Sequence, residues 1–436
     1  MVDYINKIDK YLKKLFPLTR SITGNGNRET LRYLKEIVPL EIKELKSGTD
    51  VYDWKIPREW NVKNAWIKDK NGNVLIDFME SNLHLVSYSE PINKILKLSE
   101  LKNHLHKHKT IPEAIPYRTS YYKQDWGFCV THDQYDEICN RDPDEKFHVL
   151  IDSEFNENGS LSLGELIIPG KSKKEFLIST YICHPSMAND NLSGTIMTAF
   201  MAKELLNESN LFYTYRIIWV PETIGAIAYS FFNEKNIKAI NHGLEVTTVG
   251  GRGPIGYKQS FDSSDILNLI IEEVLKNENI DYIKYPFDIH GSDERQFSSI
   301  GFRINMPLIT KDKYYEYDYY HSSLDDLNYV SGKDINKTLN LYLKTIKTFE
   351  KESLYENKLN FCEAMLSKYD LYPKLGAAQL PSKKVSSDKD IILWLLHLCD
   401  GKYSISQISK KIGVSKNKII VVADMLCAKG LLQKIK

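Results

Sequence analysis

The residues most able to do chemistry lie in one short segment, residues 181–194, which reads YICHPSMANDNLSG. This segment contains His184 and Asp190. An apolar run at 176–182 predicts a buried strand before them, and 195–206 predicts a helix after them. Open α/β sheets bind their ligands in such loops, at the carboxyl ends of strands. A histidine and a carboxylate in this position indicate a hydrolytic zinc site.

Further polar residues follow at similar places along the chain. Glu222 comes just after the apolar run 217–220, and Glu245 lies in or at the end of another strand. Asp293 lies in a polar loop, and His321 lies in an aromatic and acidic stretch. One such residue would mean little, but several at successive strand-to-loop junctions predict a shared site.

Each candidate also has a purely structural interpretation. Asp190 alone could be a helix N-cap, and Glu222 could be a surface residue in a first helical turn. His184 could bond to backbone at a strand end, and His321 could stack among tyrosines. Glu245 differs, because an acidic residue inside an apolar strand needs a partner.

The elements that position these residues alternate between strands and helices from about residue 146. Strands are predicted at 147–151, 165–168, 175–182, 215–220 and 243–249, and helices at 194–207, 224–233, 263–277 and 333–350. This alternation predicts an α/β fold, with a mostly parallel or mixed sheet covered on both faces. Helices predicted at 3–16 and 29–37 have no core of their own and should pack on this layer.

Two other regions differ from this core in composition and in hydrophobic pattern. Residues 51–149 are short aromatic-rich stretches split by Pro, Gly and Asn, which predict an inserted β-rich domain with a hairpin turn at 69–73. A Pro/Ser/Lys stretch at 381–387 predicts a linker. Helices then follow at 390–398, 404–412 and 415–429, an order typical of a winged helix-turn-helix at 385–436, with Ser404 as an N-cap. The α/β core would comprise 1–50 and 150–380.

Composition sets further bounds on the 436-residue chain. Its net charge of +1 gives no overall attraction to nucleic acid or to an acidic membrane. Six scattered cysteines with no CxxC pair predict free buried thiols in a reducing compartment. Because the chain also shows no signal peptide and no apolar run of membrane length, we expect a cytoplasmic protein with no membrane partner.

The chain resembles the zinc aminopeptidase family that includes bacterial leucyl aminopeptidases and glutamate carboxypeptidase relatives. More narrowly, it resembles prokaryotic aminopeptidase-like proteins with an inserted small domain and a C-terminal winged helix. The resemblance implies a phosphorylase/hydrolase-like mixed sheet with helices on both faces. It also implies a role for each candidate: metal ligands His184, Asp190, Glu245 and His321; general base Glu222; oxyanion donor Tyr320; and Asp293, Thr223 and Asn191 beside the metal or substrate.

Departures from the family pattern argue for one zinc ion rather than two. Thr223 stands where the family has a second Glu that binds a metal, and Ser186 stands where it has an Asp that orients the metal histidine. Glu294 replaces a His. His184, Asp190 and Glu245 could still complete one three-ligand site with an open position for water.

Three functions follow as hypotheses. The first is a zinc-dependent hydrolase of an amide bond in a peptide or small, possibly carbohydrate-linked, substrate. The second is a catalytically degenerate scaffold or binding protein linked to surface-polysaccharide metabolism, which Thr223 and Ser186 favour. The third is a DNA-binding regulator that uses the C-terminal helices, although the segment 415–424 offers few base-reading side chains, so a nucleic-acid partner is the weaker expectation. A homo-oligomer stays open.

Overall fold

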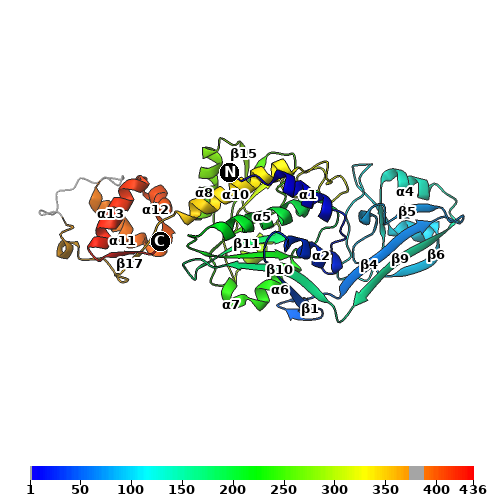
Figure 1. Ribbon diagram of the computed structural model, residues 1–436, viewed down its shortest axis with the longest axis horizontal. Helices are drawn as coiled ribbons and strands as arrows, with labels where there is room; N and C mark the ends of the chain where they lie inside the picture. Colours follow the sequence, from blue (N-terminus) through cyan, green and yellow to red (C-terminus); the bar gives the residue numbers. More distant parts are fainter. Residues whose placement is uncertain (1, 373–386) are drawn as a thin grey trace. The chain divides into compact units, whose positions relative to one another are not determined.

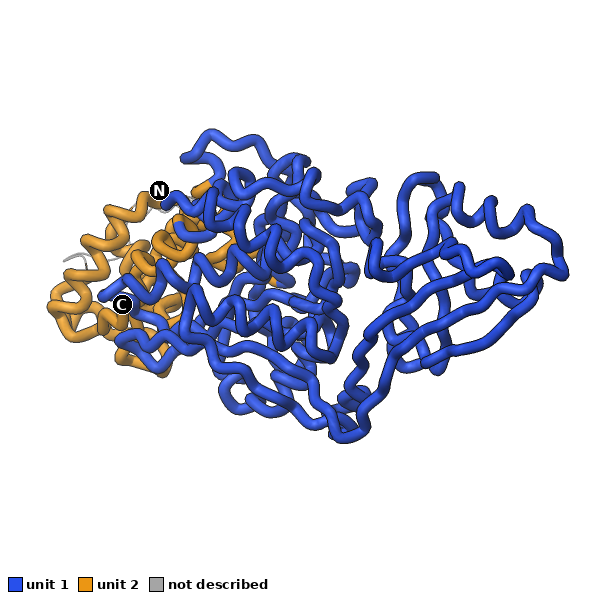
Figure 2. The backbone as a smooth tube through the Cα atoms, turned by 45° about the vertical axis from the view of Figure 1, so that its right-hand side comes forward, with its two compact units in different colours: residues 1–261, 275–343 blue, residues 262–274, 344–436 orange. Residues whose placement is uncertain are grey.

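The chain has the predicted α/β fold, as a computed structural model that describes residues 2–372 and 387–436 shows (Figure 1). The described residues form two compact units (Figure 2). The first unit comprises 1–261 and 275–343, and the second comprises 262–274 and 344–436. The division of the chain into a core, an insert at 51–149 and a tail from 385 stays a prediction, and the predicted linker at 381–387 lies, Ser387 excepted, outside the described residues.

A five-stranded mixed sheet forms the centre of the first unit. Its order is β1 (Glu41–Lys46), β10 (Ser160–Ile168), β12 (Thr214–Val220), β11 (Glu175–Tyr181) and β13 (His242–Glu245). The strands predicted at 165–168, 175–182 and 215–220 are confirmed as parts of β10, β11 and β12. Because β12, β11 and β13 are parallel neighbours, their carboxyl ends meet at one edge of the sheet.

Helices cover both faces of this sheet, as the alternation predicts. Helix α1 packs on α5, α5 packs on β11, and α6 packs on β12. In Figure 1, α5 lies above the sheet and α6 and α7 lie below it. The helices of this layer are α1 (Ile5–Leu15), α2 (Asn25–Leu34), α5 (Gly194–Asn207), α6 (Ile224–Phe232), α7 (Glu234–Ile237), α9 (Glu294–Phe297) and the first part of α10 (Gly332–Glu350). Most of α8 (Ile266–Asn277) belongs to the second unit.

Helix α2 begins earlier than the sequence predicts. The glycines and asparagines at 24–27 suggest a loop, but the helix starts at Asn25. Gly26 is needed there because a Cβ atom would lie 2.0 Å from the Thr19 carbonyl oxygen. The buried Asn27 amide also donates to the Ser21 carbonyl at 2.5 Å. Close packing against the preceding loop, rather than turn formation, therefore explains these residues.

The inserted region contains its own antiparallel sheet, of order β5 (Val74–Asp77), β4 (Glu59–Lys68), β9 (Lys146–Asn156) and β6 (Ile92–Lys97). The sequence predicts the strand at 147–151 as part of the α/β core, and this assignment is wrong. Strand β9 pairs with β4 and β6 instead. Its side chains alternate between buried and exposed positions, the pattern of an antiparallel sheet with one covered face.

One apolar cluster runs through the inserted region and the central sheet. It includes Trp60, Ile67 and Phe147 from the insert and Leu177 and Ile218 from the central strands. The smaller elements of the insert are β2 (Asp50–Val51), β3 (Trp54–Lys55), β7 (Leu105–Lys107), β8 (Phe128–Val130), α3 (Leu98–Leu101), α4 (His132–Cys139), η1 (Asn82–His84) and η2 (Lys102–His104). The shared cluster packs the inserted region against the central sheet.

A third sheet, of order β15 (Tyr282–Tyr285), β14 (Ile255–Lys258) and β16 (Leu308–Lys311), has no counterpart among the predicted strands. Its strands are four residues long, and each of them contains a lysine. Lys258 is nevertheless buried, because its ammonium group contacts Glu294 at 2.9 Å and the Tyr314 hydroxyl at 2.9 Å. Short strands whose charges are neutralised by tertiary contacts give little signal in sequence.

The C-terminal unit contains the predicted winged helix-turn-helix. Its helices are α11 (Asp388–Leu398), α12 (Ile405–Ile412) and α13 (Lys416–Ala428), and Ser404 caps α12 as expected, with its Oγ 3.3 Å from the Gln407 amide. Its sheet has the order β18 (Asp400–Ser404), β17 (Leu354–Asn357) and β19 (Leu432–Lys434). Strand β17 comes from before the predicted linker, followed by η4 (Leu366–Tyr369). The short C-terminal end therefore gains a partner strand that the sequence does not reveal.

All six cysteines are free thiols, as expected, although only Cys129, Cys183 and Cys399 are buried. Among the described helices, none combines the length and the apolar character that a membrane crossing requires.

We expect Arg28→Met to lower stability at neutral pH by roughly 1–3 kcal/mol, because Arg28 joins α2 to the start of the inserted sheet. Its guanidinium donates to both carboxylate oxygens of Glu59, at 2.7 and 2.5 Å. Hydrogen bonding from Arg28 outweighs burial and lowers the pKa of Glu59 to about 2. The wild type should therefore lose this stability as pH falls from about 5 towards 2, and the variant should not. Denaturant unfolding at several pH values measures both.

The matched control is Lys14→Met, which removes an exposed pair with Glu36 at 3.1 Å. Exposed pairs contribute little, so its stability should stay within about 0.5 kcal/mol of the wild type. Equal losses in the two variants would contradict the role given to Arg28.

Candidate active site

His184 follows the carboxyl end of β11 and is 3 % exposed. Two contacts from the N-terminal segment hold its loop. The buried Arg20 guanidinium donates to the His184 carbonyl at 2.8 Å, and Ser186 donates to the Phe16 carbonyl at 3.0 Å. Ser186 therefore does not orient the imidazole, and the main chain of the loop is fixed from outside it.

Asp190 lies in the irregular turn η3 (Ala188–Ser193) before α5 and is fully buried. The Asp325 carboxylate accepts the amides of Asn189 and Asp190, at 2.6 and 2.9 Å. Burial opposes ionisation of Asp190, but His184, His321 and a hydrogen bond from Tyr181 hold its pKa at about 2. Asp190 is therefore an ionised carboxylate in the interior, not a helix N-cap.

The structure brings His184, Asp190 and His321 together, with one ligand atom of each lying within 4.8 Å of the others. Asp190 Oδ2 and His321 Nε2 are 3.1 Å apart. Apart from each other, the two atoms have no partner in the part of the chain that the structure describes. Two ligands on one tetrahedral zinc ion are about 3.3 Å apart, so these unpartnered atoms have the spacing that a shared metal ion requires.

Glu222 lies two residues beyond β12 and faces the same group. Its Oε2 is 3.7 Å from His184 Nε2, and the Ser292 hydroxyl donates to its Oε1 at 2.9 Å. About 28 % of the side chain is exposed. Partial burial and the negative charge of Asp190 raise the pKa of Glu222 to about 7. A carboxyl group with this pKa can both take and return a proton near neutral pH.

Glu245 is not part of the group formed by His184, Asp190 and His321. It is fully buried at the end of β13, and burial, then Asp293 and Glu294, raises its pKa well above the ordinary value. Neither carboxylate oxygen of Glu245 has a hydrogen-bond partner among the described residues. Its role as a metal ligand stays a prediction. The three-ligand set expected from sequence is His184, Asp190 and Glu245, whereas the group that the structure brings together contains His321.

The remaining candidates have structural contacts. Asp293 Oδ1 accepts the Thr223 amide at 2.7 Å, which holds the backbone beside Glu222. The Asn191 amide group donates to the Tyr181 and Val246 carbonyls, at 3.1 and 3.2 Å, and so joins η3 to β11. These contacts position the site, as second-layer residues do in metal centres.

Aromatic rings flank His321, whose side chain is 34 % exposed. Tyr320 stacks on it with ring centroids 3.9 Å apart. The ring centroid of Tyr117, from the inserted region, lies 5.3 Å from the ring centroids of both His184 and His321. The insert also holds the His321 loop through its backbone, because the Tyr117 amide donates to the His321 carbonyl at 2.8 Å. The inserted region is therefore part of the site.

Sequence reasoning missed Arg20, Tyr117, Tyr181 and Asp325. Each is distant in sequence from the group it contacts or, like Tyr181, lies inside an apolar strand. Only Asp325 carried a signal, because it lies four residues after His321 in the same acidic stretch.

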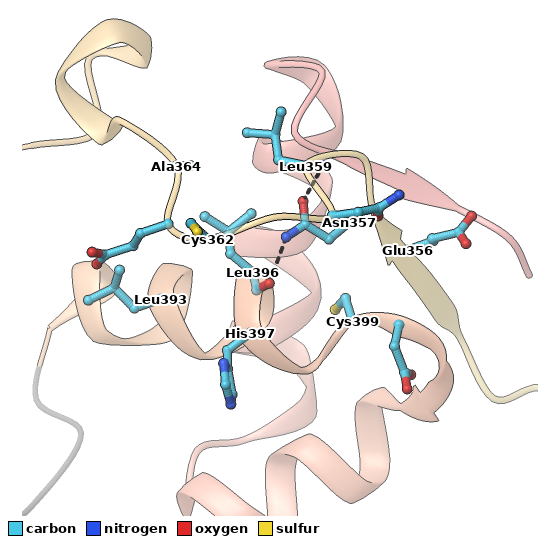
Figure 3. A pocket seen from close by; sticks show the side chains of 12 residues that line it. Glu356, Asn357, Leu359, Cys362, Ala364, Leu393, Leu396, His397 and Cys399 are labelled. Atoms are coloured by element: carbon cyan, nitrogen blue, oxygen red, sulfur yellow. Dashed lines mark hydrogen bonds between the residues drawn. The ribbon is translucent and has the colours of Figure 1, made fainter.

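A separate groove of about 500 Å³ lies within the C-terminal unit (Figure 3). Asn357 and Leu396 line it, and the Asn357 side chain donates to the Leu396 carbonyl at 2.7 Å. The charged residues that line it are acidic apart from a histidine, namely Glu356, Glu363, Asp400 and His397. The lining is therefore mostly acidic, which disfavours a phosphate.

Two family models match the chain. One, described as a domain of unknown function (DUF4910), matches residues 9–352, and one described as a winged helix-turn-helix matches 353–434. The chain belongs to the DUF4910 family. The winged-helix match begins at β17 rather than at 385, in agreement with the pairing of β17 in that sheet.

Proteins similar to this DUF4910 protein are known from both sequence and structure. A Clostridium acetobutylicum protein named "Putative polysaccharide biosynthesis protein with aminopeptidase-like domain" is 41% identical over 433 residues, covering 98% of this chain and 96% of the relative. A crystal structure of a "putative peptidase" from the same species is 39% identical, with a TM-score of 0.79, and the match covers 99% of this chain and 96% of that one.

A zinc aminopeptidase from Bacillus subtilis is similar in fold alone, at 10% identity and a TM-score of 0.59, covering 80% of this chain and 96% of that one. The predicted resemblance to zinc aminopeptidases is confirmed, and this DUF4910 protein has an aminopeptidase-like fold.

We expect Asp325→Asn to destabilise the Asp190 turn, because an amide would offer one acceptor oxygen where two backbone N–H groups now bind a carboxylate. The loss should be roughly 1–3 kcal/mol in global unfolding. Backbone hydrogen exchange at residues 189 and 190 should also become faster.

The control is Asp326→Asn, since the hydrogen bonds that Asp326 accepts come from Asn328 and Tyr329 in the loop that follows it and do not reach the Asp190 turn. Faster exchange at 189 and 190 in this control would show that the effect is not specific to Asp325.

Proposed function

We propose that the chain is a metal-dependent amide hydrolase of the aminopeptidase type, with one zinc ion. The single observation that supports this most is the unpartnered pair Asp190 Oδ2 and His321 Nε2, 3.1 Å apart beside His184. His184, Asp190 and His321 would hold the ion. When bound, zinc supplies a water of lowered pKa and polarises the scissile carbonyl.

Glu222 is the group placed to move protons in this reaction. Its carboxylate is 3.7 Å from His184, and its pKa of about 7 lets it accept a proton from the attacking water. The same carboxyl group then returns the proton to the leaving amine. Its hydrogen bond from Ser292 keeps one oxygen in place while the other faces the site.

Tyr320 is the proposed donor to the oxyanion that forms when water adds to the carbonyl. Burial raises its pKa far above the ordinary value, so its hydroxyl keeps its proton. The ring is fixed by stacking on His321, which reduces the cost of orienting the donor. Loss of one such donor costs about 3 kcal/mol in transition-state stabilisation.

The proposed substrate is a peptide or a small amide attached to a carbohydrate. The aminopeptidase-like fold supports the amide, and the polysaccharide link in the name of the Clostridium acetobutylicum relative supports the sugar. A scaffold that binds such a compound without cleaving it is the second candidate, because Thr223 and Ser186 lack the carboxylates that the aminopeptidase resemblance leads one to expect.

We expect purified protein to contain about one zinc ion per chain by elemental analysis, and the variant with His184→Ala and Asp190→Ala to contain none. Glu222→Gln should keep the zinc and lower the hydrolysis rate by at least about 10²-fold, because it removes the proton acceptor but not a ligand. Aminoacyl and sugar-amide substrates serve as the screen.

Two results would count against this proposal. No zinc in the wild type, even after supply of zinc and removal of the excess, would leave the scaffold as the better candidate. Full activity in Glu222→Gln would reject Glu222 as the base.

The winged helix is proposed as a packing or protein-contact module rather than a DNA reader. Lys416, at the start of α13, pairs with Glu273 at 3.3 Å, and Lys418 pairs with Asp388 at 3.1 Å. Both lysines of the first turn therefore already face carboxylates, which reduces the positive charge available to phosphates.

We accordingly expect no salt-dependent rise in fluorescence anisotropy when the full chain is added to labelled duplex DNA. Binding to phosphates releases counterions, so genuine DNA binding would weaken steeply as salt increases. Such a response, absent from a chain truncated before β17, would support the regulator hypothesis instead.

A further inference from the structure

The hydroxyl of Tyr181 lies inside the site but has no part in the proposed reaction. Tyr181 is the last residue of β11 and is 2 % exposed. Its Oη contacts Asp190 Oδ1 on one side and lies 2.7 Å from the Thr247 hydroxyl on the other. Thr247 is fully buried. The three side chains form a hydrogen-bonded row that solvent does not reach.

The direction of these hydrogen bonds follows from the number of protons. A carboxylate only accepts hydrogen bonds, and the Tyr181 hydroxyl lies against Asp190 Oδ1. Tyr181 has one hydroxyl proton, which it donates to Asp190, because a charged acceptor binds more strongly than a neutral one. Thr247 then donates its own proton to Tyr181 Oη. The row therefore runs from Thr247 through Tyr181 to Asp190.

This arrangement divides the two oxygens of Asp190. Oδ1 accepts the Tyr181 hydroxyl and lies 3.9 Å from His184 Nδ1, while Oδ2 lies 3.1 Å from His321 Nε2. A carboxylate that bridges two cations must offer one oxygen to each. A cation at Oδ1 would have to share that oxygen with the buried Tyr181 hydroxyl, whereas no hydroxyl lies on Oδ2.

We propose that the Tyr181 hydroxyl takes the place of a second cation on Asp190 and so limits the site to one ion. This inference rests on the proposed metal-dependent function. Tyr181 is then a positioning residue. The number of metal ions per chain would be limited both by Tyr181 and by the missing carboxylate at residue 223. Tyr181 also holds the Asp190 carboxylate at a fixed angle, with Oδ2 turned to His321.

The test restores the missing carboxylate with and without the hydroxyl. Zinc stoichiometry is measured by equilibrium dialysis and elemental analysis on full-length wild type, Thr223→Glu, and the double variant Thr223→Glu with Tyr181→Phe. We expect one ion in the wild type, one in Thr223→Glu and two in the double variant. Thr247→Val is the control and should bind one ion, because it removes the outer hydrogen bond but keeps the Tyr181 hydroxyl.

Each outcome separates this inference from the function on which it rests. Two ions in Thr223→Glu alone, or one ion in the double variant, would overturn the role of Tyr181 and leave the single-zinc hydrolase intact. No ion in any protein would overturn both. The variants with Tyr181→Phe could fail to fold because the buried Thr247 hydroxyl loses its partner. In that case Thr247→Val is added to them, and the same comparison is made.

Discussion

The buried charge of Asp190 is the constraint on which the rest of this structure depends. An ionised carboxylate in a dry interior is costly unless every neighbour compensates it. Here Tyr181 donates to one oxygen, two histidines face the carboxylate, and Asp325 fixes the turn that carries it. Of the two oxygens, Oδ2 faces His321 Nε2 at 3.1 Å, beside the position proposed for the metal ion.

The segments added to the central sheet are best understood through this constraint. The N-terminal segment reaches the His184 loop through Arg20, and the inserted region reaches the His321 loop through the backbone of Tyr117. The loop of each histidine of the site is thus held by a part of the chain outside the strands. A site held by main-chain contacts tolerates side-chain change, which is consistent with Ser186 where a carboxylate would be expected.

The errors in the sequence prediction have a common physical origin. Local sequence indicates a strand at β9 and a helix at α2, but it does not indicate what each one packs against. The side chains of β9 alternate between buried and exposed because its sheet has one covered face. In α2, Gly26 is present because it allows close contact with Thr19. Strand β17 pairs with β19, which follows it by more than seventy residues in the chain. Periodicity reports which face of an element is covered, but it does not report what covers it.

The sequence by itself determined the α/β class, the winged helix and the placement of His184 and Asp190 after a buried strand, because these follow from local periodicity and strand-end position. Only the tertiary structure decided which carboxylates and imidazoles meet. Glu245 and His321 look equally suitable as ligands in sequence, yet His321 faces Asp190 while Glu245 has Asp293 and Glu294 as neighbours. The direction of a side chain at a strand end, and the loop that approaches it, are set by contacts between residues far apart in the chain.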